Sequence, residues 1–459
     1  MATTALRGRQ RLYDVGSPEV ARFFEERGLF HPVVNNRRKI SPSTISPSCS
    51  SPSVCSGGPS CHPTPTHLVD GTTHFTSAAI SEPCDFIEIP VFLESRETLE
   101  FVGFCPERAE YIWDLWSKIP MHDIHVFNFF DFAVDFIPDP GIRQTRTEAI
   151  NEKDGWREYM DELGISTGLK TAILLPEYEN VRFTASCEFW LIESVREAYR
   201  ALESLAQQFE ESVKFFQYPE HGKDGKFKGT TEQPSTNVSP VPEGLRTKLY
   251  RASTLERATR FYIHQTGEIN EYHFATLRGD LSGTEPVTYW TPQKVVADIY
   301  AGYLKRRIPI AQIIITEVEF SEELAASVDL VSLWGTIEGG DKINPSFQEY
   351  TWSCRKGIDY RIPHYLKYLE DVDVIISNIL SLKDIEYRER DSWKEIQPSD
   401  LVRIEIDGED RLGIQWAFKS EEAQLTFEEH CRGKVTQYNL DRLLTVASKT
   451  ERSLSSATG

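Results

Sequence analysis

Residues 288–320 read TYWTPQKVVADIYAGYLKRRIPIAQIIITEVEF, and this strand, helix and strand decide the fold. The strand-like TYWT is followed by Pro292, which suits the first turn of a helix because that position needs no amide donor. We predict the helix over 293–307, with Thr291 as its N-cap. The β-branched run at 311–320 predicts a central strand. The helix has an apolar face formed by Val296, Ala297, Tyr300, Ala301 and Leu304.

Shorter elements are predicted on both sides of this unit. Upstream, KLYR at 248–251 is typical of a short strand, and a helix begins near Thr254. Downstream, the alternating aromatic and polar residues of FQEYTWSC at 347–354 predict another strand. The apolar run at 372–376 fits either a strand or a helix.

The last predicted element is a hairpin. Residues 402–406 and 412–418 alternate between apolar and polar, and Asp407 and Gly408 supply a turn between them. The two strands extend the same sheet or form a small third unit.

Two stretches without apolar periodicity divide the chain. Residues 41–67 are rich in Ser and Pro and offer too little apolar surface to offset the entropy lost on ordering. Residues 221–243 combine Gly, Lys, Pro and Thr, as linkers do. The fold class is therefore α+β, in five parts. They are a largely disordered start (1–82), a mainly helical domain (83–217), a linker (218–244), a mixed α/β domain (245–447) and a disordered tail (448–459).

The helical domain contains the clearest helix of the sequence. A strand is expected at 86–93, a helix begins at Pro106, and 124–137 supplies aromatic core residues. The helix at 189–216 could bind a protein partner through its apolar stripe, although packing within its own domain is the simpler interpretation. The stripe consists of Val195, Ala198, Leu202, Leu205, Phe209, Val213 and Phe216.

Composition excludes several classes of protein. A net charge of −20 argues against nucleic-acid binding, because phosphate is also negative. No apolar run reaches the roughly 18 residues of a membrane span, and no secretory signal is seen, so an intracellular, cytoplasmic protein is expected. Eight scattered cysteines fit a reducing compartment. Neither Cys49, Cys55 and Cys61 nor His122 and His125 have the spacing of a metal site.

The ordered elements of 248–355 resemble the ADP-ribosyltransferase superfamily, in which NAD lies in a cleft between two small sheets. The first strand of that family ends in Arg or His after an aromatic residue, as Tyr250 and Arg251 do. Its second motif is similar to 288–301, its third element is an apolar strand like 313–318, and its fourth is a strand with the catalytic Glu, which 348–352 resembles.

The resemblance implies a set of site residues. Arg251 would hold the adenosine side of NAD, with Tyr289, Thr291 and Tyr300 as further NAD contacts and Glu349 as the catalytic residue. Breaking the nicotinamide glycosidic bond develops positive charge on the ribose, so one carboxylate beneath it stabilises the transition state. An aromatic ring can stack on nicotinamide, and a guanidinium can pair with the diphosphate.

Three departures shape the functional expectation. Phe347 stands where arginine-directed enzymes carry a second Glu or Gln, and Ala252 replaces the usual small Gly. Glu317 and Glu319 form a Glu-x-Glu pattern, but on the third strand. We expect an NAD-dependent ADP-ribosyltransferase-like protein, or a non-catalytic protein-interaction module on the same fold. No His-x-x-x-His or paired-carboxylate signature supports a metal hydrolase.

Overall fold

A computed structural model describes residues 15–45, 86–119, 128–138, 155–217, 247–276, 279–282, 285–337, 342–356, 361–382 and 392–440. Helices and several small sheets alternate in these segments, so the predicted α+β class is confirmed. The predicted linker, the tail and Cys49, Cys55 and Cys61 lie outside them, as does most of the Ser/Pro stretch.

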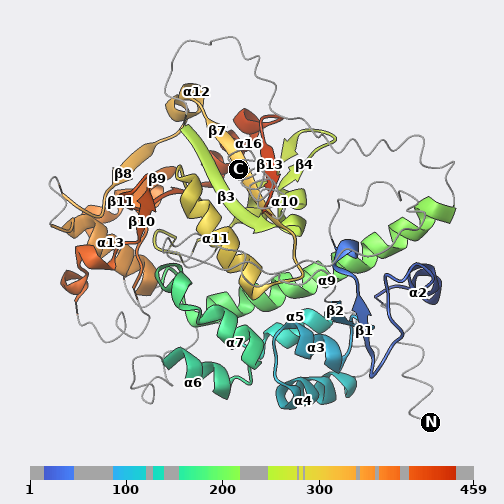
Figure 1. The fold of residues 1–459 in the computed structure, drawn as a ribbon. Coiled ribbons are helices and arrows are strands. Elements are labelled where there is room, and N and C mark those ends of the chain that lie inside the picture. The colour runs from blue at the N-terminus through green and yellow to red at the C-terminus, as the bar shows by residue number, and fades with distance from the viewer. Residues whose placement is uncertain are drawn as a thin grey trace, which may run out of the picture.

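The N-terminal part is mainly helical, as predicted. Pro106 begins a helix, where its missing amide hydrogen costs nothing. Figure 1 shows α3 to α7 on one side of the molecule and the C-terminal sheets on the other, with α9 running between them. The helices are α3 (Arg96–Val102), α4 (Pro106–Ser117), α5 (Phe129–Val134), α6 (Gly155–Glu162), α7 (Thr167–Ile173), α8 (Glu179–Arg182) and α9 (Cys187–Gln217).

Part of the stretch 1–82, which was predicted to be largely disordered, forms regular structure. Residues 15–45 contain helix α2 (Pro18–Glu25) and strand β1 (Arg37–Ile40), which pairs antiparallel with β2 (Ile87–Pro90). A tight turn enters β1: Asn35 and Asn36 have φ of 52° and 57°, a left-handed geometry that asparagine tolerates. This Asn-Asn pair is the turn signal that the sequence offered and that the prediction of disorder overlooked.

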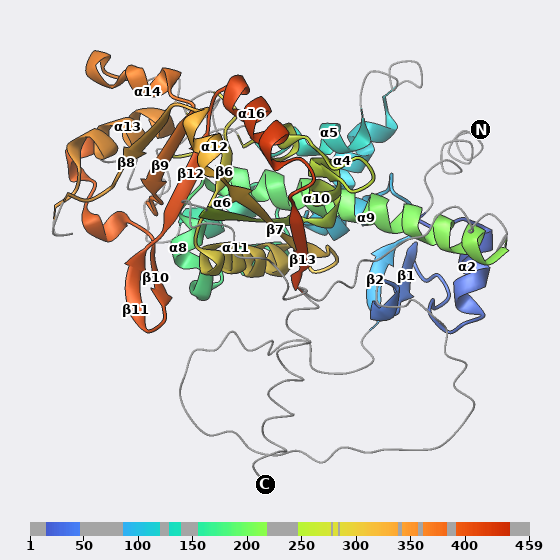
Figure 2. The same ribbon diagram turned by 90° about the horizontal axis from the view of Figure 1, so that it is seen from above.

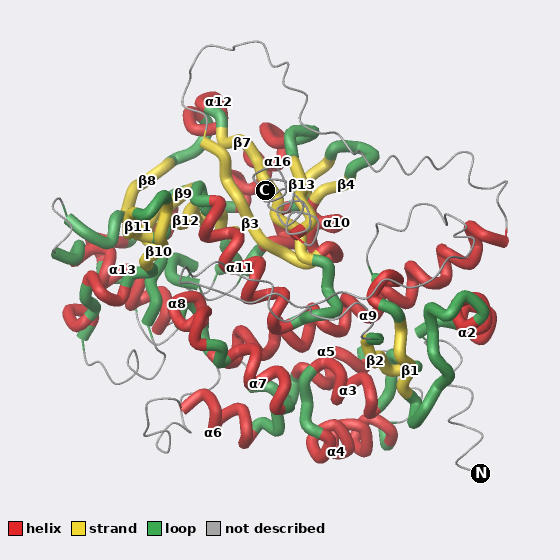
Figure 3. The backbone as a smooth tube through the Cα atoms, in the orientation of Figure 1, coloured by secondary structure: helices red, strands yellow, loops and turns green. Residues whose placement is uncertain are grey.

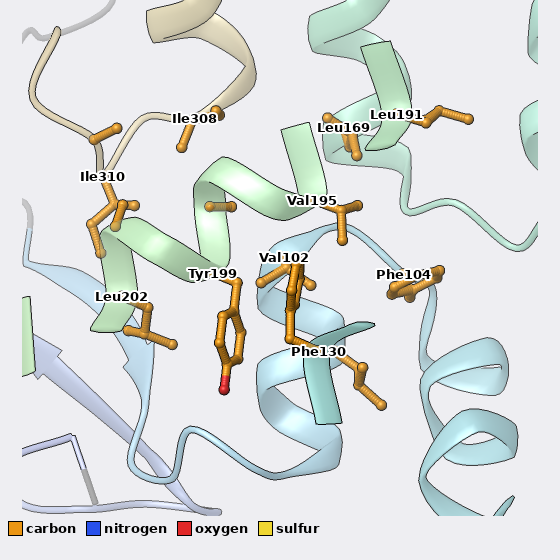
Figure 4. Packing of buried hydrophobic residues seen from close by; sticks show 14 of the residues in the cluster. Val102, Phe104, Phe130, Leu169, Leu191, Val195, Tyr199, Leu202, Ile308 and Ile310 are labelled. Atoms are coloured by element: carbon orange, nitrogen blue, oxygen red, sulfur yellow. The ribbon is translucent and has the colours of Figure 1, made fainter. Parts of the chain in front are cut away.

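The apolar stripe of α9 is buried within its own chain. Leu202 and Val195 are 0% exposed. Figure 4 shows Val195, Tyr199 and Leu202 near Val102 and Phe130, and the rings of Tyr199 and Phe130 stack with centroids 4.5 Å apart. The stripe residues whose side chains are described therefore pack inside this chain, in a core that includes residues of both the N-terminal part and α11.

The two larger sheets of the C-terminal part are joined by a backbone bridge. The backbones of Tyr250 and Thr291 exchange two hydrogen bonds, of 2.7 and 3.0 Å, and so join β3 to the segment after β6. Figure 2 gives a second view of the two sheets. The first has the order β13 (Thr436–Asn439), β7 (Ile313–Phe320), β3 (Thr247–Thr254). The second has the order β6 (Thr288–Trp290), β12 (Ile414–Phe418), β9 (Val374–Asn378), β8 (Leu330–Leu333).

The three-stranded sheet is covered on both faces, because side chains alternate along a strand. Ala252 and Ile315 belong to the core that includes α11 (Lys294–Arg307). Leu249 and Val318 belong to the core that includes α16 (Glu421–Cys431). This double burial explains why β7 reads as a nearly continuous apolar run.

The structure contradicts one predicted strand and changes the predicted start of helix α11. Residues 347–354 form most of helix α13 (Pro345–Lys356). Asn344 accepts a hydrogen bond from the amide of Ser346, and Pro345 occupies the first turn, so an Asn-Pro helix start was missed. Helix α11 begins at Lys294, with Gln293 rather than Thr291 at its N-cap position.

The other C-terminal predictions hold in part. The predicted turn at Asp407 and Gly408 has positive φ and joins β10 (Arg403–Ile406) to β11 (Glu409–Leu412), and the run at 372–376 becomes strand β9. The predicted return strand at 412–418 was wrong, because residues 414–418 form β12, which pairs with β6 and β9 instead. Figure 3 shows the strands in yellow and the helices in red. The remaining elements are α10 (Leu255–Phe261), β4 (Tyr262–Ile263), β5 (Glu268–Ile269), the 3₁₀ helix η7 (Glu271–Phe274), α12 (Glu322–Ala326) and α14 (Tyr368–Asp371).

Among the helices of the described segments, none has the length and apolarity needed to cross a bilayer.

The burial of the α9 stripe predicts a strong effect of truncation. Leu202→Ala should lower the free energy of unfolding by about 3 kcal/mol, because it removes a buried side chain and leaves a cavity. Gln207→Ala changes an exposed position of the same helix and should alter that free energy by less than about 0.5 kcal/mol. Urea unfolding measures both, and equal losses would contradict the packing described.

Candidate functional site

A cavity of about 170 Å³ lies where the two sheets and helix α9 come together. Its wall combines residues from β3, β6, α11, β12 and α9, which are far apart in the sequence. All four residues predicted to contact NAD line this cavity, namely Arg251, Tyr289, Thr291 and Tyr300.

Arg251 connects the two sheets through its side chain. Its guanidinium donates hydrogen bonds of 2.6 Å to the carbonyl oxygens of Tyr289 and Phe274, and lies 4.9 Å from the Phe274 ring centroid. Thr276 Oγ1 is 3.4 Å away. These oxygens carry no formal charge. Burial, and next the charge of Arg257, lower the pKa of Arg251 from 12.5 to about 9.

Tyr289 is fixed by a close backbone contact. Its hydroxyl accepts a 3.0 Å hydrogen bond from the amide of Leu281. A Cβ atom at Gly279 would lie only 2.3 Å from that hydroxyl, so glycine is needed there for space. Burial raises the pKa of Tyr289. The ring is therefore a neutral, immobile part of the cavity wall.

Thr291 and Tyr300 hold neighbouring segments in place. The Thr291 hydroxyl accepts a 3.1 Å hydrogen bond from the amide of Gln293, just before α11 begins. The Tyr300 hydroxyl donates to Thr184 Oγ1 at 3.0 Å, which links α11 to the N-terminal part. Burial raises the pKa of Tyr300 to about 12.

Glu349 does not share the cavity with these residues. It lies on helix α13, is half-buried and accepts a hydrogen bond from the Tyr365 hydroxyl. It is absent from the residues that line the cavity. The expectation that Glu349 lies on a strand beside Arg251 was wrong, because a stretch in which aromatic and polar residues alternate folded as a helix.

In contrast to Glu349, Gln415 lines the cavity and lies on strand β12. The sequence patterns did not single it out. It is 8% exposed, and its side-chain amide donates 3.1 Å hydrogen bonds to Asp280 Oδ2 and to the Asn378 carbonyl. Asp280 Oδ1 is in turn 2.6 Å from the Arg355 guanidinium. A single polar residue inside the apolar strand IQWAF was the available signal.

Helix α9 contributes residues that the sequence patterns also left unmarked. Phe189, Trp190 and Glu193 line the cavity from the N-terminal part. Arg307 of α11 donates to Ser194 Oγ at 2.9 Å, and its guanidinium lies 4.5 Å from the Trp190 ring centroid. The cavity therefore requires both parts of the chain.

The described segments contain no group of three or more His, Cys, Asp or Glu residues able to hold a metal ion. His122 and His125 fall outside those segments. Comparisons of the chain with protein-family models, with curated proteins and with solved structures gave no match.

A buried acid lies directly behind the cavity wall. Glu271 is 0% exposed and its Oε1 accepts a 3.0 Å hydrogen bond from the indole nitrogen of Trp290, which lines the cavity. Oε2 of Glu271 is buried with no hydrogen-bond partner among the described residues. Burial raises the pKa of this carboxyl from 4.5 to about 8.

This raised pKa predicts that stability falls as pH rises. Between about pH 4.5 and 8 the folded state keeps a proton that the unfolded state has lost. Glu271 should therefore reduce stability by up to about 1.4 kcal/mol per pH unit in this window. Glu271→Gln keeps an acceptor for Trp290 but cannot ionise, so urea unfolding from pH 5 to 8 should show a smaller decline. Parallel curves for both proteins would refute the assignment.

Proposed function

We propose that this chain is an ADP-ribosyltransferase-like protein that binds the nicotinamide end of NAD in the cavity between its two sheets. The observation that carries the proposal is the meeting of Arg251, Tyr289, Thr291 and Tyr300 in one cavity. These residues lie on three elements that are separate in the sequence, and each is one that the resemblance to the ADP-ribosyltransferases implies as an NAD contact.

The size and lining of the cavity support an aromatic ligand of one ring. Its volume of about 170 Å³ is close to that of the roughly 150 Å³ cavity that accepts benzene in another protein. Tyr289 and Tyr300 offer ring surfaces, and a nicotinamide ring can stack on them. The remainder of a dinucleotide would have to extend beyond this space.

Binding of NAD is better supported than transfer of ADP-ribose. A carboxylate stabilises the charge that develops on the ribose. The carboxylates that line the cavity, Glu193 and Asp280, already pair with arginines. The polar group that β12 presents to the cavity is the neutral amide of Gln415. Its carbonyl oxygen can accept a hydrogen bond from a ribose hydroxyl. Turnover through Gln415 would be slow for lack of a negative charge.

The neutral amide of Gln415 in the cavity also favours a second function, that of a non-catalytic module on the same fold. Arg251 also fits this role, because its guanidinium is engaged with backbone carbonyl oxygens. Such a module would recognise a partner without consuming NAD.

We also propose an intracellular location. Cys105 and Cys431 are free thiols in the described segments, as expected in a reducing compartment.

The test compares NAD binding by three proteins, using isothermal titration calorimetry. The wild type should bind NAD, and Gln415→Ala should bind it about tenfold more weakly because an acceptor in the cavity is lost. Glu349→Gln, which changes a carboxylate outside the cavity, should bind like the wild type.

Two outcomes would contradict the proposal. The first is the absence of NAD binding by the folded wild type. The second is equal weakening by Glu349→Gln and Gln415→Ala, which would place Glu349 at the site after all. Nicotinamide release measured with the same samples separates the two candidate functions, since a non-catalytic module releases none.

A further inference from the structure

Glu193 of helix α9 lies between two arginines that come from the other part of the chain. Its Oε2 is 2.8 Å from the Arg307 guanidinium, and its Oε1 is 3.6 Å from that of Arg257. All three side chains line the cavity. A carboxylate in this position occupies the place between two cations that an anionic ligand would also prefer.

The charges of the cavity wall do not balance. Its cations are Arg251, Arg257 and Arg307, and its carboxylates are Glu193 and Asp280. Asp280 already forms an ion pair with Arg355, which lies outside the lining. Glu193 is thus the lining carboxylate that pairs with Arg257 and Arg307, whereas Arg251 binds only uncharged oxygens. This excess of positive charge contrasts with the net charge of −20 of the whole chain.

The two arginines are held in place before any ligand arrives. Arg307 is 2% exposed, lies 4.5 Å from the ring centroids of Trp190 and Tyr303, and donates to Ser194 Oγ. Its Nε is buried with no hydrogen-bond partner in the part of the chain that the structure describes. Arg257 donates from Nε to the His273 carbonyl at 3.1 Å. Their fixed positions lower the entropy lost on binding an anion.

Solvent reaches this cluster on one side. The side chains of Glu193 and Arg257 are 20% and 17% exposed, in contrast to that of Arg307. A ligand can therefore approach Glu193 and Arg257 first, with Arg307 behind them.

We propose that Arg257 and Arg307 form a phosphate subsite, and that Glu193 occupies it as an internal anion which a phosphate-bearing ligand displaces. A phosphate group has more acceptor oxygens and more negative charge than a carboxylate, so it can pair with both guanidinium groups at once. Glu193 then acts as a specificity residue. Its carboxylate excludes singly charged anions and is displaced by a phosphate ester or a diphosphate.

The test titrates inorganic pyrophosphate into the full chain and measures affinity by calorimetry, with acetate as a singly charged comparison. Glu193→Gln removes the competing charge, so pyrophosphate should bind about tenfold more tightly than to the wild type. Glu177→Gln is the matched control, because Glu177 pairs with Arg306 at 3.9 Å outside the cavity. It should leave the affinity unchanged.

Two further variants keep the test decisive if Glu193→Gln does not fold. Arg257→Gln should weaken pyrophosphate binding to the wild type about tenfold, whereas Glu193→Asp, which shortens the side chain, should strengthen it. Equal affinities of Glu193→Gln and the wild type would overturn the proposal, as would weaker binding by Glu193→Gln. Pyrophosphate binding without NAD binding would support this subsite and remove the proposed NAD function, so the two can fail separately.

Discussion

The buried guanidinium of Arg251 is the constraint on which the rest of the site depends. A buried charge is costly unless its donors are satisfied, and here two backbone carbonyls and the Phe274 ring meet that need. One carbonyl belongs to Tyr289 of β6 and the other to Phe274 of η7. Strand β3 is thereby held against both segments, and the backbone pair between Tyr250 and Thr291 lies beside this anchor.

The site belongs to both parts of the chain. Side chains of α11 donate hydrogen bonds to the N-terminal part, among them those to Thr184, to the Ile173 carbonyl and to Ser194. Thr254, the N-cap of α10, donates from its hydroxyl to Glu197 of α9 at 2.6 Å. A division into a helical domain and a separate α/β domain describes the sequence, but the cavity exists only where the two meet.

Local patterns predicted the elements whose signals agree with one another. Strand β7 and helix α11 each have the period of their own structure, and the turn between β10 and β11 has its Asp-Gly pair. The predicted NAD contacts Arg251, Tyr289, Thr291 and Tyr300 were chosen from the order of these elements along the chain. Helix α13 was missed because FQEYTWSC fits a period of two as well as one of 3.6, and most of its residues are buried. Periodicity cannot separate helix from strand when every face is covered.

Long-range contacts were beyond what local patterns can show. Gln415 and Glu193 became part of the site through contacts with distant segments, Gln415 with Asp280 and Glu193 with two arginines. In the sequence, Glu193 is one of seventy acids and has no local feature that marks it. Its importance comes from the two arginines across the cavity.

The measurement that tests the role of Arg251 most directly is amide hydrogen exchange at Tyr250 and Thr291 in the wild type and in Arg251→Lys. Lysine keeps the charge but lacks the planar, two-branched donor that reaches both carbonyls. If Arg251 holds the two sheets together, these two amides should exchange markedly faster in the variant, with unchanged exchange in the distant helix α4. Equal protection of both amides in the two proteins would show that Arg251 does not hold the sheets together.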